Sequence, residues 1–106
     1  MPKYLVQASY TAEGMKGLLA EGGSGRKAAV EHVVGSCGGT VESVYFAYGD
    51  ADFYCVLDFP DDLSMAAIAM TVRASGALHS KTIPLLTVEE IDAATKKSVG
   101  FRPPGA

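Results

Sequence analysis

Residues Val41–Phe59 read VESVYFAYGDADFYCVLDF, and this stretch decides the fold. Two runs rich in β-branched and aromatic residues flank a short polar turn at residues 49–51. That pattern predicts a β-hairpin. The rest of the chain then supplies elements that cover this hairpin or pair with its edges.

The turn sets the register of the hairpin. With residues 49–51 as the loop, Tyr48 faces Asp52 and Phe46 faces Tyr54, and alternate residues point to opposite sheet faces. One face is nearly all apolar and is predicted to lie under the helices: Val41, Ser43, Tyr45, Ala47, Phe53, Cys55, Leu57 and Phe59. The other face is apolar in its middle, with carboxylates at its ends: Glu42, Val44, Phe46, Tyr48, Asp52, Tyr54, Val56 and Asp58. A loop one residue longer or shorter would break this parity.

Local signals predict the elements before the hairpin. Lys3–Tyr10 mixes β-formers without a helical period and is predicted to be the first strand. Thr11 is a typical N-cap for a short helix over residues 12–21, which the glycines of segment 22–25 break. Ser24 is then predicted to cap a second helix. Gly38 and Gly39 end it, because glycine tolerates the left-handed conformation common after helices.

The same kind of signal predicts the elements after the hairpin. Pro60-Asp61-Asp62 begins a helix over residues 63–75, whose apolar circumference predicts extensive burial, and Gly76 ends it. Residues 78–86 form the last strand, at a sheet edge because Pro84 cannot donate to a ladder. Thr87 and Glu90 match a capping box, so a short helix is expected to run to about Lys96 before an extended tail.

The order strand–helix–strand, repeated once, predicts an α+β fold. Right-handed crossovers fold it into the ferredoxin-like βαββαβ arrangement, a four-stranded antiparallel sheet with both main helices on one face. At 106 residues the chain leaves little room for a second core, so one domain is expected. Its core spans residues 3–87, and a short helix and extended tail occupy residues 88–106.

Composition excludes several classes of function. The net charge of −3 and the absence of a basic face argue against a nucleic-acid partner. The N-terminus lacks a signal-peptide pattern and no run of about 18 apolar residues exists, so a cytoplasmic protein with no membrane partner is predicted. Cys37 and Cys55 lie outside any CxxC pattern, and no second Cys/His cluster could complete a metal site with them. We therefore predict that both thiols are reduced and pack as small buried apolar side chains. The sequence predicts no metal and no cofactor.

A four-stranded sheet with helices on one face leaves its other face bare. The residues assigned to that face are Leu5, Val44, Phe46, Tyr48, Tyr54 and Val56. Burying each side chain contributes about 1.5–3 kcal/mol, so six of them total on the order of 10 kcal/mol, comparable to the net stability of a small domain. The sequence therefore predicts a homodimer or higher homo-oligomer with sheets packed face to face, with room for a cavity between sheet and helices.

Two groups of residues are candidate sites. Arg26 follows Gly23, Ser24 and Gly25 at a predicted helix N-terminus, where backbone N–H groups and a guanidinium suit a phosphate or carboxylate. The alternative is a helix cap with a solvated arginine. A ligand site for a small anionic or aromatic molecule is drawn from Arg26, Tyr48, Tyr54, His79 and Lys81. In the alternative, the tyrosines are core or interface residues and His79 is a surface residue.

Three segments carry a family resemblance: KYLVQASYTAEGMKGLLAEGGSGRKAAVE, VESVYFAYGDADFYCVLDFPDD and SVGFRPPGA. Together they resemble the GYD domain family of small bacterial proteins over nearly the whole chain. Gly49 and Asp52 match the glycine and aspartate of the family's hairpin turn, and Ala51 stands where its tyrosine is expected. The family resembles the dimeric α+β barrel superfamily, which implies a dimer and no established reaction.

Two functions remain open at this point. The first is a homo-oligomeric module that binds a small ligand or serves assembly alone. The alternative is a cofactor-independent oxygenase or isomerase acting on a small aromatic or acidic substrate, which rests on analogy with the fold. An enclosed pocket holding His79 or Arg26 beside a tyrosine favours the enzyme, and a sheet–sheet interface without a void favours pure assembly.

Overall fold

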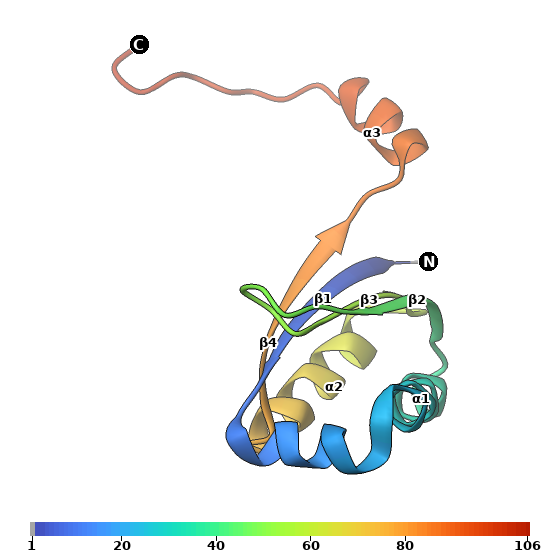
Figure 1. Ribbon diagram of the computed structural model, residues 1–106. Coiled ribbons are helices and arrows are strands. Elements are labelled where there is room, and N and C mark those ends of the chain that lie inside the picture. The colour runs from blue at the N-terminus through green and yellow to red at the C-terminus, as the bar shows by residue number, and fades with distance from the viewer. Residues whose placement is uncertain (1) are drawn as a thin grey trace.

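The computed structural model describes residues 2–106. In chain order the elements are β1 (Lys3–Tyr10), α1 (Ala12–Ser36), β2 (Thr40–Phe46), β3 (Phe53–Asp58), α2 (Asp62–Ala74), β4 (Leu78–Leu85) and α3 (Val88–Thr95). The strands form one antiparallel sheet in the order β2-β3-β1-β4. Helices α1 and α2 cover one face of this sheet, and α3 stands on the other side (Figure 1). The predicted α+β class, antiparallel sheet and βαββαβ order are confirmed, with α3 following.

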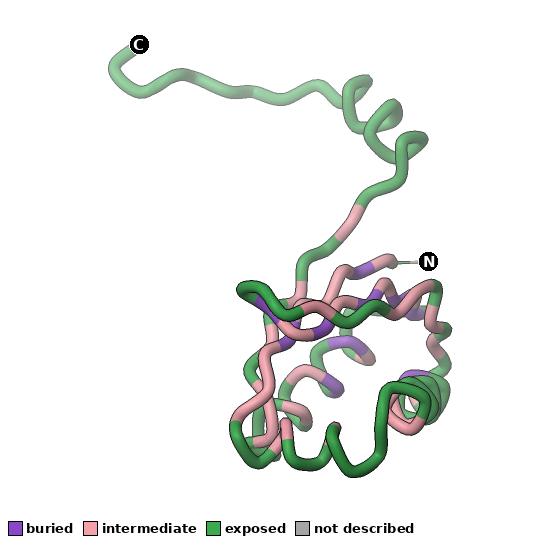
Figure 2. Tube along the Cα trace, viewed as in Figure 1, coloured by how far each residue is buried: buried purple, intermediate pink, exposed green. Residues whose placement is uncertain are grey.

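The hydrophobic core lies between the sheet and the two covering helices. Its most buried side chains are Phe59, with no exposed surface, and Val34. Figure 2 shows buried positions on the strands and on the helices facing them, whereas everything after residue 85 is exposed. Among residues 2–106, no helix combines the length and apolarity that crossing a membrane requires.

Helix α1 is bent sharply at Gly22, where φ is +73°. Only glycine adopts this left-handed conformation without strain, so the predicted break is confirmed at this residue. A second helical arm follows the break as predicted, but the predicted Ser24 cap is wrong, because helical geometry resumes directly at Gly23. The bend turns residues 23–36 across the sheet (Figure 1). The sequence 12–36 therefore forms two helical arms joined without a loop.

The predicted register of the hairpin is wrong by one residue. Tyr45 pairs with Tyr54 and Phe46 with Phe53, and the register shifts again between Val41 and Ser43. The connection runs from Ala47 to Asp52, closed by a hydrogen bond from the Ala47 N–H to the Asp52 carbonyl at 2.8 Å. The Asp52 N–H in turn donates to the Ala8 carbonyl of β1 at 2.8 Å. Asp52, which the turn pattern paired with Tyr48 in the hairpin, is thus hydrogen-bonded to β1 instead.

This shift reverses the faces of residues 43–46 of β2, but leaves Val41 and β3 on the faces that were predicted. Val44 and Phe46 lie on the helix side, and the Phe46 ring meets Phe53 edge-on with centroids 5.4 Å apart. Their assignment to the bare face is therefore wrong. Ser43 and Tyr45 take their places on the bare face, opposite Val56 and Tyr54. Leu5, Tyr54 and Val56 lie on that face as predicted, whereas Tyr48 is fully exposed in the connection.

Helix α2 buries only one stripe of side chains, contrary to the predicted extensive burial. Met65 and Ile68 are buried, one turn apart, whereas Leu63 and Met70 are largely exposed. The helix packs over β4 at the edge of the sheet, so its outer face meets no second layer in one copy of the chain.

Asp61 caps α2 as predicted. Its Oδ1 accepts the Ser64 N–H at 2.8 Å, and this hydrogen bond lowers the pKa of Asp61 below its usual 3.8. A carboxyl whose pKa is lowered by folding stabilises the protein in full above the unfolded-state value. That contribution disappears as the pH falls through the folded-state value.

We expect Asp61→Ala to lower Tm at pH 7, because the Ser64 N–H loses its acceptor. Asp61→Asn keeps an acceptor but not the charge, so its Tm at pH 7 stays close to that of the wild type. On acidification below about pH 4 the wild type loses this stabilisation and the Asn variant does not. Thermal melts followed by circular dichroism between pH 7 and pH 2 measure both effects. An Ala variant that melts with the wild type at pH 7 would contradict the cap.

Candidate functional site

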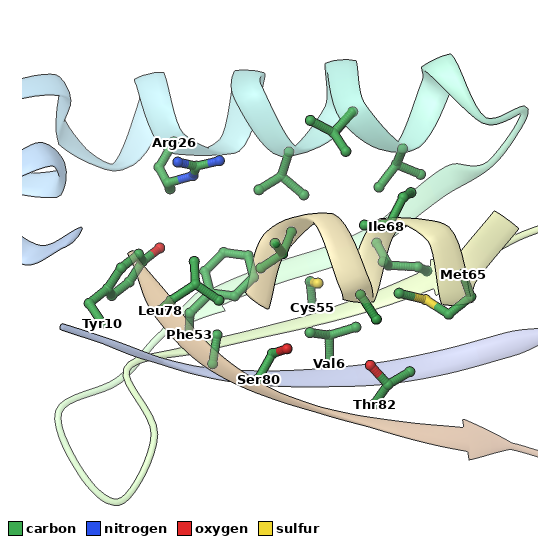
Figure 3. Close-up of a pocket in the computed structure, with 17 residues that line it drawn as sticks. Val6, Tyr10, Arg26, Phe53, Cys55, Met65, Ile68, Leu78, Ser80 and Thr82 are labelled. Carbon is green, nitrogen blue, oxygen red and sulfur yellow. The ribbon is translucent and has the colours of Figure 1, made fainter. Parts of the chain in front are cut away.

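A cavity of about 90 Å³ lies between α1, α2 and the helix side of the sheet, partly open to solvent (Figure 3). It is lined almost entirely by apolar atoms. The lining residues are Val6, Ala8, Tyr10, Arg26, Val30, Val33, Val34, Phe53, Cys55, Leu57, Met65, Ile68, Ala69, Val72, Leu78, Ser80 and Thr82. Side chains with polar groups are therefore few, and where they stand decides what the cavity can hold.

Two of these polar side chains lie toward the same end of the cavity. Arg26 comes from the second arm of α1, one turn after the bend at Gly22, and Tyr10 comes from the end of β1 (Figure 3). The Tyr10 N–H donates to Asp52 Oδ2 at 2.9 Å, which fixes the strand end. Arg26 Nη1 lies 3.4 Å from Glu21 Oε1, an ion pair that spans the bend. A guanidinium and a phenol thus lie at the same end of an apolar space.

The electrostatics of the lining keep its titratable groups neutral, apart from Arg26. Burial raises the pKa of Tyr10, Glu21 and Asp52 act in the same direction, and Arg26 opposes them. The phenol is therefore a hydrogen-bond donor at neutral pH. Burial also raises the pKa of the Cys55 thiol to about 12. Because the thiolate is the nucleophilic form, Cys55 is inert at neutral pH and packs as a small apolar residue.

Of the remaining predicted ligand residues, Tyr48 is fully exposed in the connection between β2 and β3, and the other three lie on the opposite side of the sheet. Tyr54 and Lys81 flank Gln7 in one row across the strands, and His79 pairs with Ser9 one row further along. The sheet separates all three from Arg26, so the structure does not unite the predicted set in one pocket. The tyrosine that does stand beside Arg26 is Tyr10. The alternation of faces along β1 could have indicated Tyr10 from the sequence, because Tyr4, Ala8 and Tyr10 share the helix side of this strand.

The predicted anion-binding turn already has a carboxylate beside it. The backbone of Gly25 lies against the side chain of Glu21, with the position of a Cβ on Gly25 3.1 Å from Glu21 Cβ. Glu21 also pairs with Arg26, while Gly23 and Ser24 are exposed. An anion at this turn would have to displace Glu21 from Arg26.

The sheet face away from α1 and α2, here called the open face, is a second candidate surface. Its residues are Lys3, Leu5, Gln7, Ser9, Ser43, Tyr45, Tyr54, Val56, Asp58, His79, Lys81, Ile83 and Leu85. One row across the strands holds three apolar residues, Val56, Leu5 and Ile83, and ends at Ser43 on β2. At one end Lys3 donates to both Glu42 and Asp58. The open face therefore has an apolar centre and a charged rim.

The acidic residues that cluster in the sequence serve separate structural roles. Asp52 accepts from the Tyr10 N–H, Asp61 caps α2, and Asp62 accepts from the Tyr4 hydroxyl. Within residues 2–106, no three His, Cys, Asp or Glu side chains converge in a way that could hold a metal ion.

Of the comparisons with known proteins, only the one with protein families gave a match. The family model described as GYD domain matches residues 4–95, which run from β1 through the end of α3. Searches of curated proteins and of solved structures each returned no match. The match covers the sheet, its two covering helices and every residue that lines the cavity. The chain therefore belongs to the GYD domain family.

Proposed function

We propose that the protein is a homo-oligomeric binding module whose cavity holds a small organic acid. The observation that carries this proposal is an apolar cavity with one guanidinium and one phenol hydroxyl toward one end. Apolar pockets with a few convergent polar groups are the usual form of small-molecule sites, in which the polar groups orient the ligand. Arg26 and Tyr10 supply donors for a carboxylate, and the space behind them takes an apolar body.

The donors and the volume together limit the ligand. A guanidinium presents paired N–H donors that match a carboxylate, and the neutral Tyr10 hydroxyl supplies a further donor. The ligand carboxylate would take the place of Glu21 beside Arg26. The cavity, at about 90 Å³, is smaller than the roughly 150 Å³ apolar cavity that admits benzene. Short aliphatic acids therefore fit best, and a single aromatic ring requires a small separation of α1 and α2.

An oxygenase or isomerase is the second candidate, because an arginine does stand beside a tyrosine in the cavity. Proton abstraction, however, needs a base. Of the residues described as lining the cavity, none carries a carboxylate or imidazole, and Cys55 stays protonated at neutral pH. We therefore place binding ahead of catalysis.

The open face supports the oligomeric half of the proposal. Its apolar row of Val56, Leu5 and Ile83 is flanked by Tyr45, which is 71% exposed. A second copy packed sheet to sheet would remove this row from water, as in a dimeric α+β barrel. In the corrected register, Ser43 and Tyr45 replace Val44 and Phe46 on this surface. The apolar row remains, so the reason to expect self-association remains as well.

The decisive comparison is Arg26→Met against Lys27→Met, which removes a charge from the neighbouring, exposed position of α1. We expect butanoate to bind the wild type and Lys27→Met alike, and Arg26→Met at least about tenfold more weakly, because the carboxylate loses a charged donor. Isothermal titration measures the affinities. Butan-1-ol, which lacks the carboxylate, serves as the control ligand.

Native mass spectrometry of the protein as purified reports both the subunit count and any retained small molecule. A mass of two or more chains of 11.0 kDa supports the oligomer. If hexanoate, butanoate and benzoate all fail to bind, or bind Arg26→Met as well as the wild type, the carboxylate site is wrong. Turnover of a bound acid under oxygen would instead establish the enzyme.

A further inference from the structure

The chain after β4 forms an arm that leaves the body of the protein. Residues 86–106, here called the C-terminal arm, are exposed throughout. The radius of gyration is 16.9 Å, whereas a compact chain of this length has about 13 Å, and the longest dimension reaches 56 Å. Figure 1 shows the arm on the side of the sheet opposite α1 and α2. It thus stands over the side on which the open face lies.

Helix α3 within the arm is too short to be stable by itself. It has eight residues, and isolated helices below about 12–15 residues are marginal in water. Its N-terminus is nevertheless fully capped, since Thr87 and Glu90 form the predicted capping box. The apolar residues Val88 and Ile91 lie one turn apart and are 74% and 47% exposed. A helix with good caps and an uncovered apolar stripe requires a packing partner.

We propose that the C-terminal arm is part of a subunit interface and packs against a second copy of this chain, which is docked on the open face. This inference rests on the self-association in the proposed function and adds the segment that completes it. Each subunit contributes its sheet face to the centre of the contact. Each arm then reaches past the sheet edge at β4 and lays the apolar stripe of α3 against the other copy. Val99 and Phe101, both largely exposed, extend the contact along the tail.

The area of the open face supports a contribution of the arm to the interface. Four strands spaced about 4.8 Å apart, with six to eight residues at about 3.3 Å each, give a face of about 460 Å². Two such faces bury about 920 Å² in total, just below the roughly 1,000 Å² expected of a specific interface. Stable interfaces bury about 1,200–2,000 Å². The arm supplies the missing area with the apolar residues that the body leaves uncovered.

Charge also favours a second copy over an unrelated partner. Helix α3 carries Glu89, Glu90 and Asp92 close together. The open face carries exposed Lys81 and His79 on β4, and Lys81 is absent from the ion pairs formed within residues 2–106. An acidic helix laid beside this strand of the second copy is complementary in charge.

The test uses the full chain with matched pairs of substitutions. Val88→Asp with Ile91→Asp removes the stripe of α3, and Leu63→Asp with Met70→Asp makes the same change on exposed residues of α2. Analytical ultracentrifugation measures the dimer dissociation constant, with circular dichroism to check folding. We expect the arm pair to weaken the dimer on the order of a hundredfold, about tenfold for each lost apolar contact, and the α2 pair to leave it unchanged.

A third variant separates this inference from the proposed function. Val56→Asp places a charge at the centre of the open face and should abolish the dimer. If it does so while the arm pair leaves the dissociation constant unchanged, the arm inference fails and the sheet–sheet dimer stands. A wild type that remains a monomer at millimolar concentration overturns both.

Hydrogen exchange distinguishes a second copy from folding back within one chain. We expect protection of the α3 amides to rise with protein concentration, because the partner is another subunit. Protection that is strong and independent of concentration means that the arm packs on its own body, which would overturn the inference.

Discussion

Phe59→Ala is expected to destabilise the protein by about 4 kcal/mol, because large-to-small changes at fully buried aromatic positions leave a cavity. Phe59 has no exposed surface and packs against Tyr4 with ring centroids 6.2 Å apart. Gly39 lies so close to this ring that the position of a Cβ there would be 2.6 Å from it. The ring thus joins β1, the start of β2 and the end of β3. Equilibrium unfolding in urea at a fixed protein concentration measures the loss.

Tyr48→Ala is the matched control for this change. It also removes an aromatic ring from the hairpin segment, but from a residue that is fully exposed. We expect its effect on the free energy of unfolding to stay within about 0.5 kcal/mol. Equal effects of the two substitutions would show that Phe59 is not the centre of the core.

Gly14→Ala is expected to destabilise by roughly 3 kcal/mol although it adds one methyl group. A Cβ at residue 14 would stand 1.9 Å from the Ala77 carbonyl oxygen, which is backbone and cannot turn away. That oxygen also accepts from the Thr11 N–H at 3.0 Å and from the Thr11 hydroxyl. The substitution therefore forces apart the start of α1 and the segment that leads into β4. Urea denaturation measures it on the same scale as Phe59→Ala.

Gly17→Ala provides a control of opposite sign in the same helix. Nothing lies within 4 Å of a Cβ at this residue, which is exposed. Alanine costs less backbone entropy than glycine in a helix, so we expect stabilisation of about 0.5–1 kcal/mol. If both glycines tolerate alanine equally, the close approach of Gly14 to Ala77 is contradicted.

The candidate site could be predicted only in part. Arg26 was found from the glycine-rich segment before it, because an arginine after a helix break is a local signal. Tyr10 is absent from the predicted ligand set, although the alternation along β1 places it on the helix side of the sheet with Tyr4 and Ala8. It joins Arg26 because β1 ends where the bent helix α1 passes over the sheet (Figure 3). The sequence does not determine which sheet face His79 and Lys81 occupy. The register of β4 against β1 places both on the open face, across the sheet from Arg26.

Elements whose limits depend on local chemistry were predicted from the sequence alone. The sequence predicts β1, the break at Gly22, the Asp61 cap and the Thr87 capping box, because each depends on residues within a turn of one another. The hairpin register was decided by the tertiary structure. Asp52 is held by hydrogen bonds to Ala8 and Tyr10, more than 40 residues earlier in the chain, and these bonds lengthen the connection. Because strand parity has a period of two, that single change moved the middle of β2 from one face to the other.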